Sequence, residues 1–183
     1  MRRFFCLAAL MLVVGCTNQP PQPYATLPAD SVQGAGDPLR SAVNQSAFVF
    51  SNPRQFVNRP IDVARAVANL EYMTVAVPVN PAFTNFGGGL PNLLIEGRNA
   101  ARVVYGIAGD AEPQAVIDGL YAVARALVAG DRAASMRALS APAFPNPAAT
   151  MQALSQAPIV PAANVATSRV AEEIMQTRTE RRL

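Results

Sequence analysis

The side chains that can carry out chemistry are few in type. The chain of 183 residues contains no histidine, no lysine and no tryptophan, and its two cysteines stand at positions 6 and 16. Catalysis by Ser-His-Asp or Cys-His groups, zinc or haem held by histidine, and Schiff-base chemistry at lysine are therefore excluded within this sequence. A pair of carboxylates, as used to hydrolyse glycosides, is the catalytic chemistry that remains. The carboxylates that come into question are Asp62, Glu71, Glu96, Asp110, Glu112 and Asp118.

Most of these carboxylates stand where a helix is expected to begin. An acidic side chain there caps backbone N–H groups or complements the helix dipole, which explains it without catalysis. We therefore predict that the protein is not an enzyme, has no catalytic residue, binds no metal and needs no cofactor. A carboxylate-dependent cell-wall hydrolase is the alternative, and it requires two of these groups in one cleft with raised pKa values.

Two arginines, Arg98 and Arg102, are candidate ligand contacts because they lie four residues apart and would stack as like charges on a helix. They either pair with acids on a neighbouring helix or bind an acidic group. A second hypothesis is an apolar cavity between helices that carries a small ligand or a lipid. Its lining would be Tyr72, Met73, Tyr105 and Tyr121, which are otherwise plain core residues.

Cys16 follows a short positive segment, Met1-Arg2-Arg3, and eleven apolar residues at positions 4–14. That run is too short to span a bilayer as a helix and has the length of a secretory signal. Its end, Val13-Val14-Gly15-Cys16, resembles the lipobox of bacterial lipoprotein precursors. The alternative is that Cys16 is an ordinary buried thiol in an N-terminal helix.

The resemblance covers only the first sixteen residues, and it implies a lipid anchor. The Cys16 sulfur would receive a diacylglyceryl group, the peptide bond between Gly15 and Cys16 would be cut, and the new amino group would be acylated, with palmitate among the acyl chains. Thr17 follows the Cys. Retention in the inner membrane usually goes with Asp at this position, so Thr17 favours the periplasmic face of the outer membrane. The implied partner is the lipid bilayer, reached through the acylated Cys16.

Composition divides the rest of the chain into three parts. Residues 16–37 are rich in proline and lack periodicity, which predicts a disordered linker behind the anchor. Residues 38–177 are the expected domain, and residues 178–183 are a polar tail. Without the signal at residues 1–15, 13 arginines face 12 acidic residues, so the sequence gives no basis for a nucleic-acid partner.

Hydrophobic spacing predicts an all-α domain, a small irregular bundle of about five to seven helices. The expected helices are 38–50, 60–77, about 91–108, 113–129, 131–140, 147–154 and 162–177. The helix at 60–77 is apolar nearly all round, which is typical of a central helix. Residues 72–79 are β-branched enough that a strand is the alternative there, and Pro78 and Pro81 end either element.

Glycines mark the connections. Gly109-Asp110 and Gly130-Asp131 each suit the end of one helix and the N-cap of the next. Gly87, Gly88 and Gly89 form a connection that could present N–H groups to an anion, but it lacks the sequence context of a phosphate loop, which favours a plain flexible connection.

The sequence thus favours a membrane-anchored envelope lipoprotein. Its helical module would be non-catalytic and would support envelope structure or bind an envelope protein. The carrier and the hydrolase described above are the alternatives. No family is recognised for the helical domain.

Overall fold

The computed structural model describes residues 24–32, 36–83, 89–139 and 142–180. Within these ranges the fold is all-α, with seven α-helices and no strand, as predicted. The lipobox residues Val13, Val14, Gly15 and Cys16 lie outside the described residues, as do Gly87 and Gly88.

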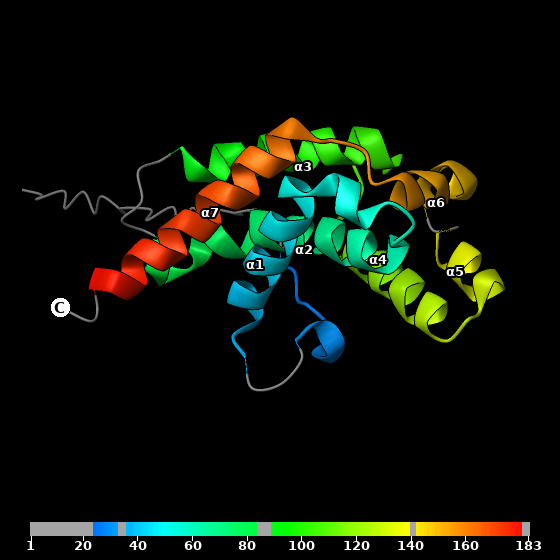
Figure 1. The fold of residues 1–183 in the computed structure, drawn as a ribbon, viewed down its shortest axis with the longest axis horizontal. Helices are drawn as coiled ribbons and strands as arrows, with labels where there is room; N and C mark the ends of the chain where they lie inside the picture. The colour runs from blue at the N-terminus through cyan, green and yellow to red at the C-terminus, as the bar shows by residue number, and fades with distance from the viewer. Residues whose placement is uncertain (1–23, 33–35, 84–88, 140–141, 181–183) are drawn as a thin grey trace, which may run out of the picture.

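The helices follow one another with short connections (Figure 1). They are α1 (Pro38–Ser51), α2 (Pro60–Val79), α3 (Leu90–Tyr105), α4 (Pro113–Val128), α5 (Arg132–Ala138), α6 (Pro147–Gln156) and α7 (Pro161–Glu180), with short 3-10 turns at η1 (Ala29–Ser31), η2 (Pro53–Phe56) and η3 (Pro81–Phe83).

Local chemistry fixes where most helices begin. Proline occupies the first or second position of six of the seven, where its missing N–H costs no hydrogen bond. Three helices also begin with a capping side chain that accepts a hydrogen bond from a backbone N–H. Asp37 caps α1 through Arg40 N at 2.7 Å, Asp131 caps α5 through Ala134 N at 2.8 Å, and Asn146 caps α6 through Ala149 N at 3.1 Å.

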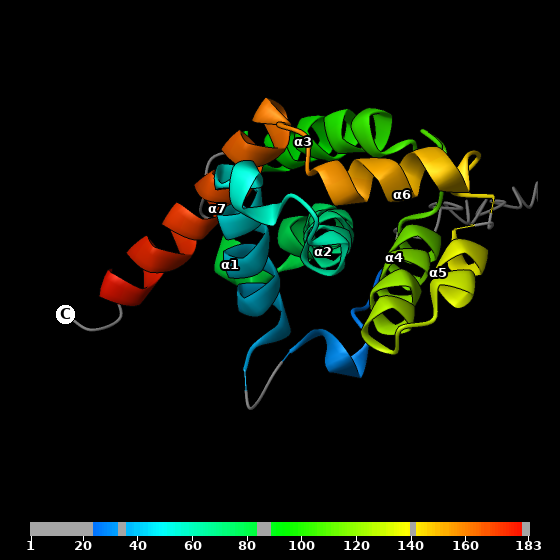
Figure 2. The same cartoon turned by 45° about the vertical axis from the view of Figure 1, so that its right-hand side comes forward.

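Helix α2 is the centre of the bundle, as its apolar surface predicts. It packs against α1, α3, α4 and α6, and Figure 2 looks nearly along it with these helices around it. Val63, Ala64 and Met73 of α2 are fully buried. Helix α7 covers the other side of α1 and α3. The strand alternative for residues 72–79 is wrong, because α2 continues through them.

A small polar cluster is enclosed within this core. The hydroxyl of Tyr121 on α4 donates to Asn69 Oδ1 on α2 at 2.8 Å. The Asn69 amide donates in turn to Gln45 Oε1 on α1 at 2.9 Å. The cluster therefore joins three helices, and both polar ends of the buried Asn69 side chain have partners.

Two predicted helix ends are wrong. Pro78 lies within the last turn of α2 and does not end it, since it removes only its own N–H donor from the helix. The helix runs to Val79, and the other predicted stop, Pro81, follows the C-cap residue Asn80. Helix α3 ends at Tyr105, where Gly106 takes a positive φ of 66°. Gly109-Asp110 therefore lies in the loop beyond it and caps neither helix.

Two further expectations need correction. The helical spacing of residues 113–129 predicts that Val128 points inward, as Leu120 and Ala124 do, but it is 66% exposed at the end of α4. Residues 178–180, expected to belong to a polar tail, continue α7, since nothing in that sequence stops a helix. The remaining tail residues, 181–183, lie outside the described part.

Residues 24–32, which precede α1, lie on the bundle. Ala25 is buried, and the Thr26 backbone exchanges two hydrogen bonds with the Gln114 side chain, at 2.7 Å and 3.2 Å. Asp30 forms an ion pair with Arg125 at 3.0 Å. Part of the segment predicted as linker, residues 16–37, is therefore attached to the domain, which shortens the stretch between Cys16 and the first docked residues.

Candidate functional site

The two arginines proposed as ligand contacts have different surroundings. Arg102 of α3 points at Glu71 of α2, and its guanidinium forms two parallel bonds to the carboxylate, Nε–Oε1 and Nη2–Oε2, both 2.7 Å long. Its remaining nitrogen donates to the Gly109 carbonyl at 2.8 Å. Glu71 is 1% exposed and Arg102 is 3% exposed. The pair is closed to solvent, so Arg102 offers no donor to a ligand.

Arg98 lies one turn earlier on α3 and is partly open. Its guanidinium donates to Asn99 Oδ1 at 3.1 Å and 3.3 Å. Partial burial, followed by the positive charge of Arg102, lowers the pKa of Arg98 from its ordinary value. Of the two arginines, the one paired with an acid of a neighbouring helix is Arg102, which was one of the two outcomes predicted for them.

The three tyrosines do not line one cavity. Tyr105 and Tyr121 are buried in the core, and burial raises the pKa of both, that of Tyr121 to about 12. Tyr72 instead borders a surface cleft, where partial burial and then the Asp37 carboxylate raise its pKa. Met73 is fully buried with Tyr105 and Tyr121 in the core, whereas Tyr72 borders the cleft.

The candidate carboxylates have separate partners or face solvent. Glu71 is held by Arg102, Asp62 pairs with Arg59 at 2.9 Å, and Asp118 accepts from Gln114 at 2.8 Å. Glu96, Asp110 and Glu112 are exposed. In the described ranges, no group of three histidine, cysteine or acidic side chains is placed to hold a metal ion.

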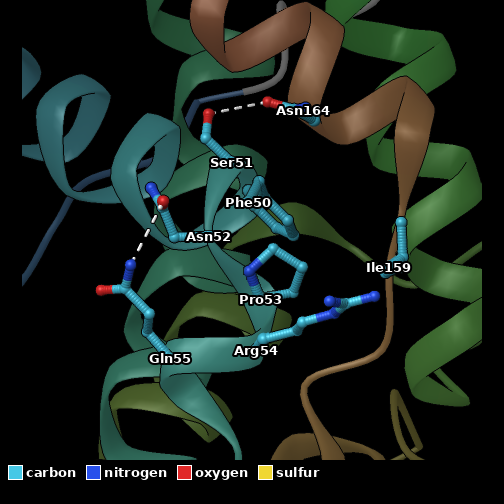
Figure 3. Close-up of a pocket in the computed structure, with 8 residues that line it drawn as sticks. All are labelled: Phe50, Ser51, Asn52, Pro53, Arg54, Gln55, Ile159 and Asn164. Atoms are coloured by element: carbon cyan, nitrogen blue, oxygen red, sulfur yellow. Dashed lines mark hydrogen bonds between the residues drawn. The ribbon is translucent and has the colours of Figure 1, made fainter.

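A cleft of about 390 Å³ lies between the end of α1 and the start of α7 (Figure 3). Phe50, Pro53 and Ile159 give it apolar walls, and the Arg54 guanidinium extends across it toward Ile159. At its upper edge Ser51 donates to Asn164 Oδ1 at 2.8 Å.

Arg54 is the side chain of this cleft that sequence analysis missed. Among the described residues, no acidic group lies within ion-pair distance of it. The available signal was its place directly after Ser51-Asn52-Pro53, a helix stop that presents the next side chain at the surface. The opposite wall comes from Ile159 and Asn164, more than a hundred residues later, which local sequence does not reveal.

A second cleft, of about 510 Å³, lies where the described chain begins. Tyr24 and Leu27 form one side, and Tyr72 and Val79 of α2 form the other, with Pro38 of α1 at its edge. None of the residues that line this cleft is charged. By contrast, the α1–α7 cleft includes Arg54, and a shallow depression on α3 includes Glu96.

In the described part of the chain, none of the helices has the length and apolar character required to cross a bilayer. Comparison with known proteins gives no match: no family model, no curated protein and no solved structure is similar to this chain.

Proposed function

We propose that the protein is a cell-envelope lipoprotein, held at the bilayer by an acylated Cys16, whose helical domain binds another envelope protein without catalysis. The observation that carries the anchor is the sequence Val13-Val14-Gly15-Cys16 after a positive segment and eleven apolar residues. Acyl chains gain about 0.8 kcal/mol per buried methylene, so two chains suffice for stable anchoring.

Support for a binding role comes from comparing the buried polar groups of the domain, which bind one another, with Arg54 at the α1–α7 cleft. Glu71 and Arg102 satisfy each other, and Tyr121 is bound to Asn69 inside the core. These groups hold helices together. The α1–α7 cleft, by contrast, leaves Arg54 without an acidic partner beside apolar walls, an arrangement that suits an acidic side chain next to an apolar one on a partner protein.

The anchor is tested by metabolic labelling with a palmitate analogue in the native host. We expect label on the wild-type protein and none on Cys16→Ser, and an intact mass that begins at Cys16 with its acyl groups. A wild-type protein that keeps residues 1–15 and a free Cys16 thiol would contradict the proposal.

The binding role is tested by site-specific photocrosslinking in intact cells. A photoreactive amino acid at Ile159, which is 65% exposed at the α1–α7 cleft, should give a discrete adduct with an envelope protein. The matched control is Val128, 66% exposed at the end of α4. Arg54→Glu should abolish the Ile159 adduct. Equal adducts at both positions, or no effect of Arg54→Glu, would remove the cleft from the binding role.

A further inference from the structure

We propose that the uncharged cleft formed by Tyr24, Leu27, Pro38, Tyr72 and Val79 rests on the surface of the bilayer that holds the acyl chains of Cys16, which fixes the orientation of the domain. This inference rests on the proposed function, since it requires the anchor. It specifies which surface of the domain faces the membrane and therefore which side stays accessible to partners.

The first argument is the length of the tether. Only residues 16–23 separate the acylated residue from the start of the docked chain, because Thr26 and Asp30 are already bound to α4. Eight residues span at most about 29 Å when fully extended. A domain of this size has a radius of gyration of about 15 Å. Tyr24 therefore cannot move further from the bilayer than about the width of the domain itself.

The second argument is the chemistry of the surface at the end of that tether. Tyr24 is 82% exposed and Val79 is 67% exposed, and both border the cleft. Tyrosine suits a membrane interface because its ring is apolar and its hydroxyl stays hydrated. Among the described residues, no charged side chain lines the cleft. Lowering it into the headgroup region would therefore not require a charge to be buried.

Asp37 is an acidic group near this surface, since its charge, after burial, contributes to the raised pKa of Tyr72. Its carboxylate is engaged at the first turn of α1, where it accepts from Arg40 N at 2.7 Å. Asp37 is exposed and is not among the residues that line the cleft.

Because of the tether, the cleft needs only a weak affinity for the bilayer. A link of eight residues makes contact with the bilayer an intramolecular event, so a weak intrinsic affinity gives a populated contact. The same surface without the anchor would not hold the protein on a membrane.

In this orientation the end of α4 points away from the end of α2, as Figure 1 shows with the two helix ends on opposite sides of the molecule.

The test uses tryptophan as a reporter, because the natural chain contains none. Val79→Trp places the probe at the cleft, and Val128→Trp is a matched control, since the two valines are 67% and 66% exposed. Both acylated full-length variants are purified from cell envelopes. They are reconstituted in phosphatidylcholine–phosphatidylglycerol vesicles, with or without brominated acyl chains.

We expect the emission of Val79→Trp to shift to shorter wavelength in vesicles and to lose most of its intensity with brominated lipid. The emission of Val128→Trp should stay unchanged. Equal quenching of the two probes, or no quenching of either on protein that floats with the vesicles, overturns the proposed surface while the anchor stands.

Two measurements on the same preparations separate the other outcomes. If intact mass shows no acyl group and the protein does not float with vesicles, the proposed function fails and the surface falls with it. If Val79→Trp is already shifted in Cys16→Ser protein without lipid, the cleft is covered by this chain or by a second copy, and the bilayer is not its occupant.

Discussion

At the residue scale, the Glu71–Arg102 pair is the most demanding feature of the interior. Two charges removed from water lose several kcal/mol of hydration each, which only good geometry and further hydrogen bonds offset. Both conditions hold here: the two groups form parallel 2.7 Å bonds, and Arg102 also binds the Gly109 carbonyl. The pair thus ties α2, α3 and the following loop together in one arrangement.

Removing one member of this pair should be costly. Glu71→Gln leaves the buried Arg102 charge without its counterion, and we expect the free energy of unfolding to fall by about 3–5 kcal/mol. Urea unfolding followed by circular dichroism measures it. Asp62→Asn, which breaks the more exposed pair with Arg59, should cost at most about 1 kcal/mol. A loss as small for Glu71→Gln would show that the pair is hydrated.

The buried tyrosines predict a loss of stability at high pH. Burial raises the pKa of Tyr121 to about 12, so the folded state keeps a proton that the unfolded state releases above about pH 10. Stability from this group is therefore fully present below pH 10 and decreases as the pH rises from 10 toward 12. The slope is up to about 1.4 kcal/mol per pH unit for each such tyrosine.

Tyr121→Phe isolates the contribution of this group. Although the variant loses the hydrogen bond to Asn69, its unfolding free energy should fall less steeply between pH 10 and 12 than that of the wild type. Urea titrations at several pH values give both slopes. Identical slopes would show that Tyr121 ionises equally in the folded and unfolded states.

At the element scale, small residues set how closely helices approach. A Cβ added at Gly97 of α3 would lie 2.9 Å from Ala166 Cβ and 3.0 Å from the Ala162 carbonyl, both on α7. At Gly119 of α4 it would lie 2.5 Å from Phe144 Cε2. These two glycines allow contacts that alanine would prevent.

Gly119→Ala should therefore destabilise the fold by about 1–3 kcal/mol, because overpacking outweighs the higher helix propensity of alanine. Gly109→Ala is the control, since a Cβ there meets nothing within 4 Å, and its effect should stay within about 0.5 kcal/mol. Thermal and urea unfolding compare the two. Equal effects would mean that Phe144 moves aside freely.

The two Gly-Asp joints provide a second matched comparison. Asp131 accepts a hydrogen bond from Ala134 N at the start of α5, whereas Asp110 lies in the loop after α3 and caps no helix. We expect Asp131→Ala to cost about 1 kcal/mol and Asp110→Ala to cost almost nothing. Chemical unfolding of both variants checks this, and an equal cost would assign Asp110 a role that its position does not explain.

At the scale of the whole molecule, the short tether and the uncharged cleft act together. A Gly-Ser insertion of twenty residues after residue 23 would add a root-mean-square reach of about 25 Å. The effective concentration of the cleft at the bilayer would fall, so brominated lipid should quench Val79→Trp less in this variant. The parent Val79→Trp protein is the control, and unchanged quenching would show that the cleft binds lipid without help from the tether.

Much of the architecture follows from local sequence. Pro60, Pro113 and Pro147 mark helix starts because proline suits the first helical turn, and Asp131 is a cap as predicted. The end of α3 was not predictable in the same way. Gly106 and Gly109 can both end a helix, and the structure ends α3 before Gly106, with Gly109 in the loop where its carbonyl accepts from Arg102.

The candidate sites also differ in whether local sequence could predict them. The anchor is a local motif and could be proposed from residues 1–16, where it remains a prediction. The clefts could not be proposed, because each joins segments far apart in the chain: Arg54 faces the region before α7, and Tyr24 faces α2. Val128 illustrates the converse, since its helical spacing favours burial but it is 66% exposed in the described structure.

The sequence by itself determined the helical class, the helix starts and the types of chemistry available, because these depend on residues within one or two turns of each other. Only the tertiary structure decided that Arg102 pairs with Glu71 and that residues 24–32 dock on the bundle. It also placed Tyr72 at a cleft, while Tyr105 and Tyr121 fill the core. These outcomes depend on which helix faces pack against each other, because burial between packed helices sets the environment of each charge and hydroxyl group.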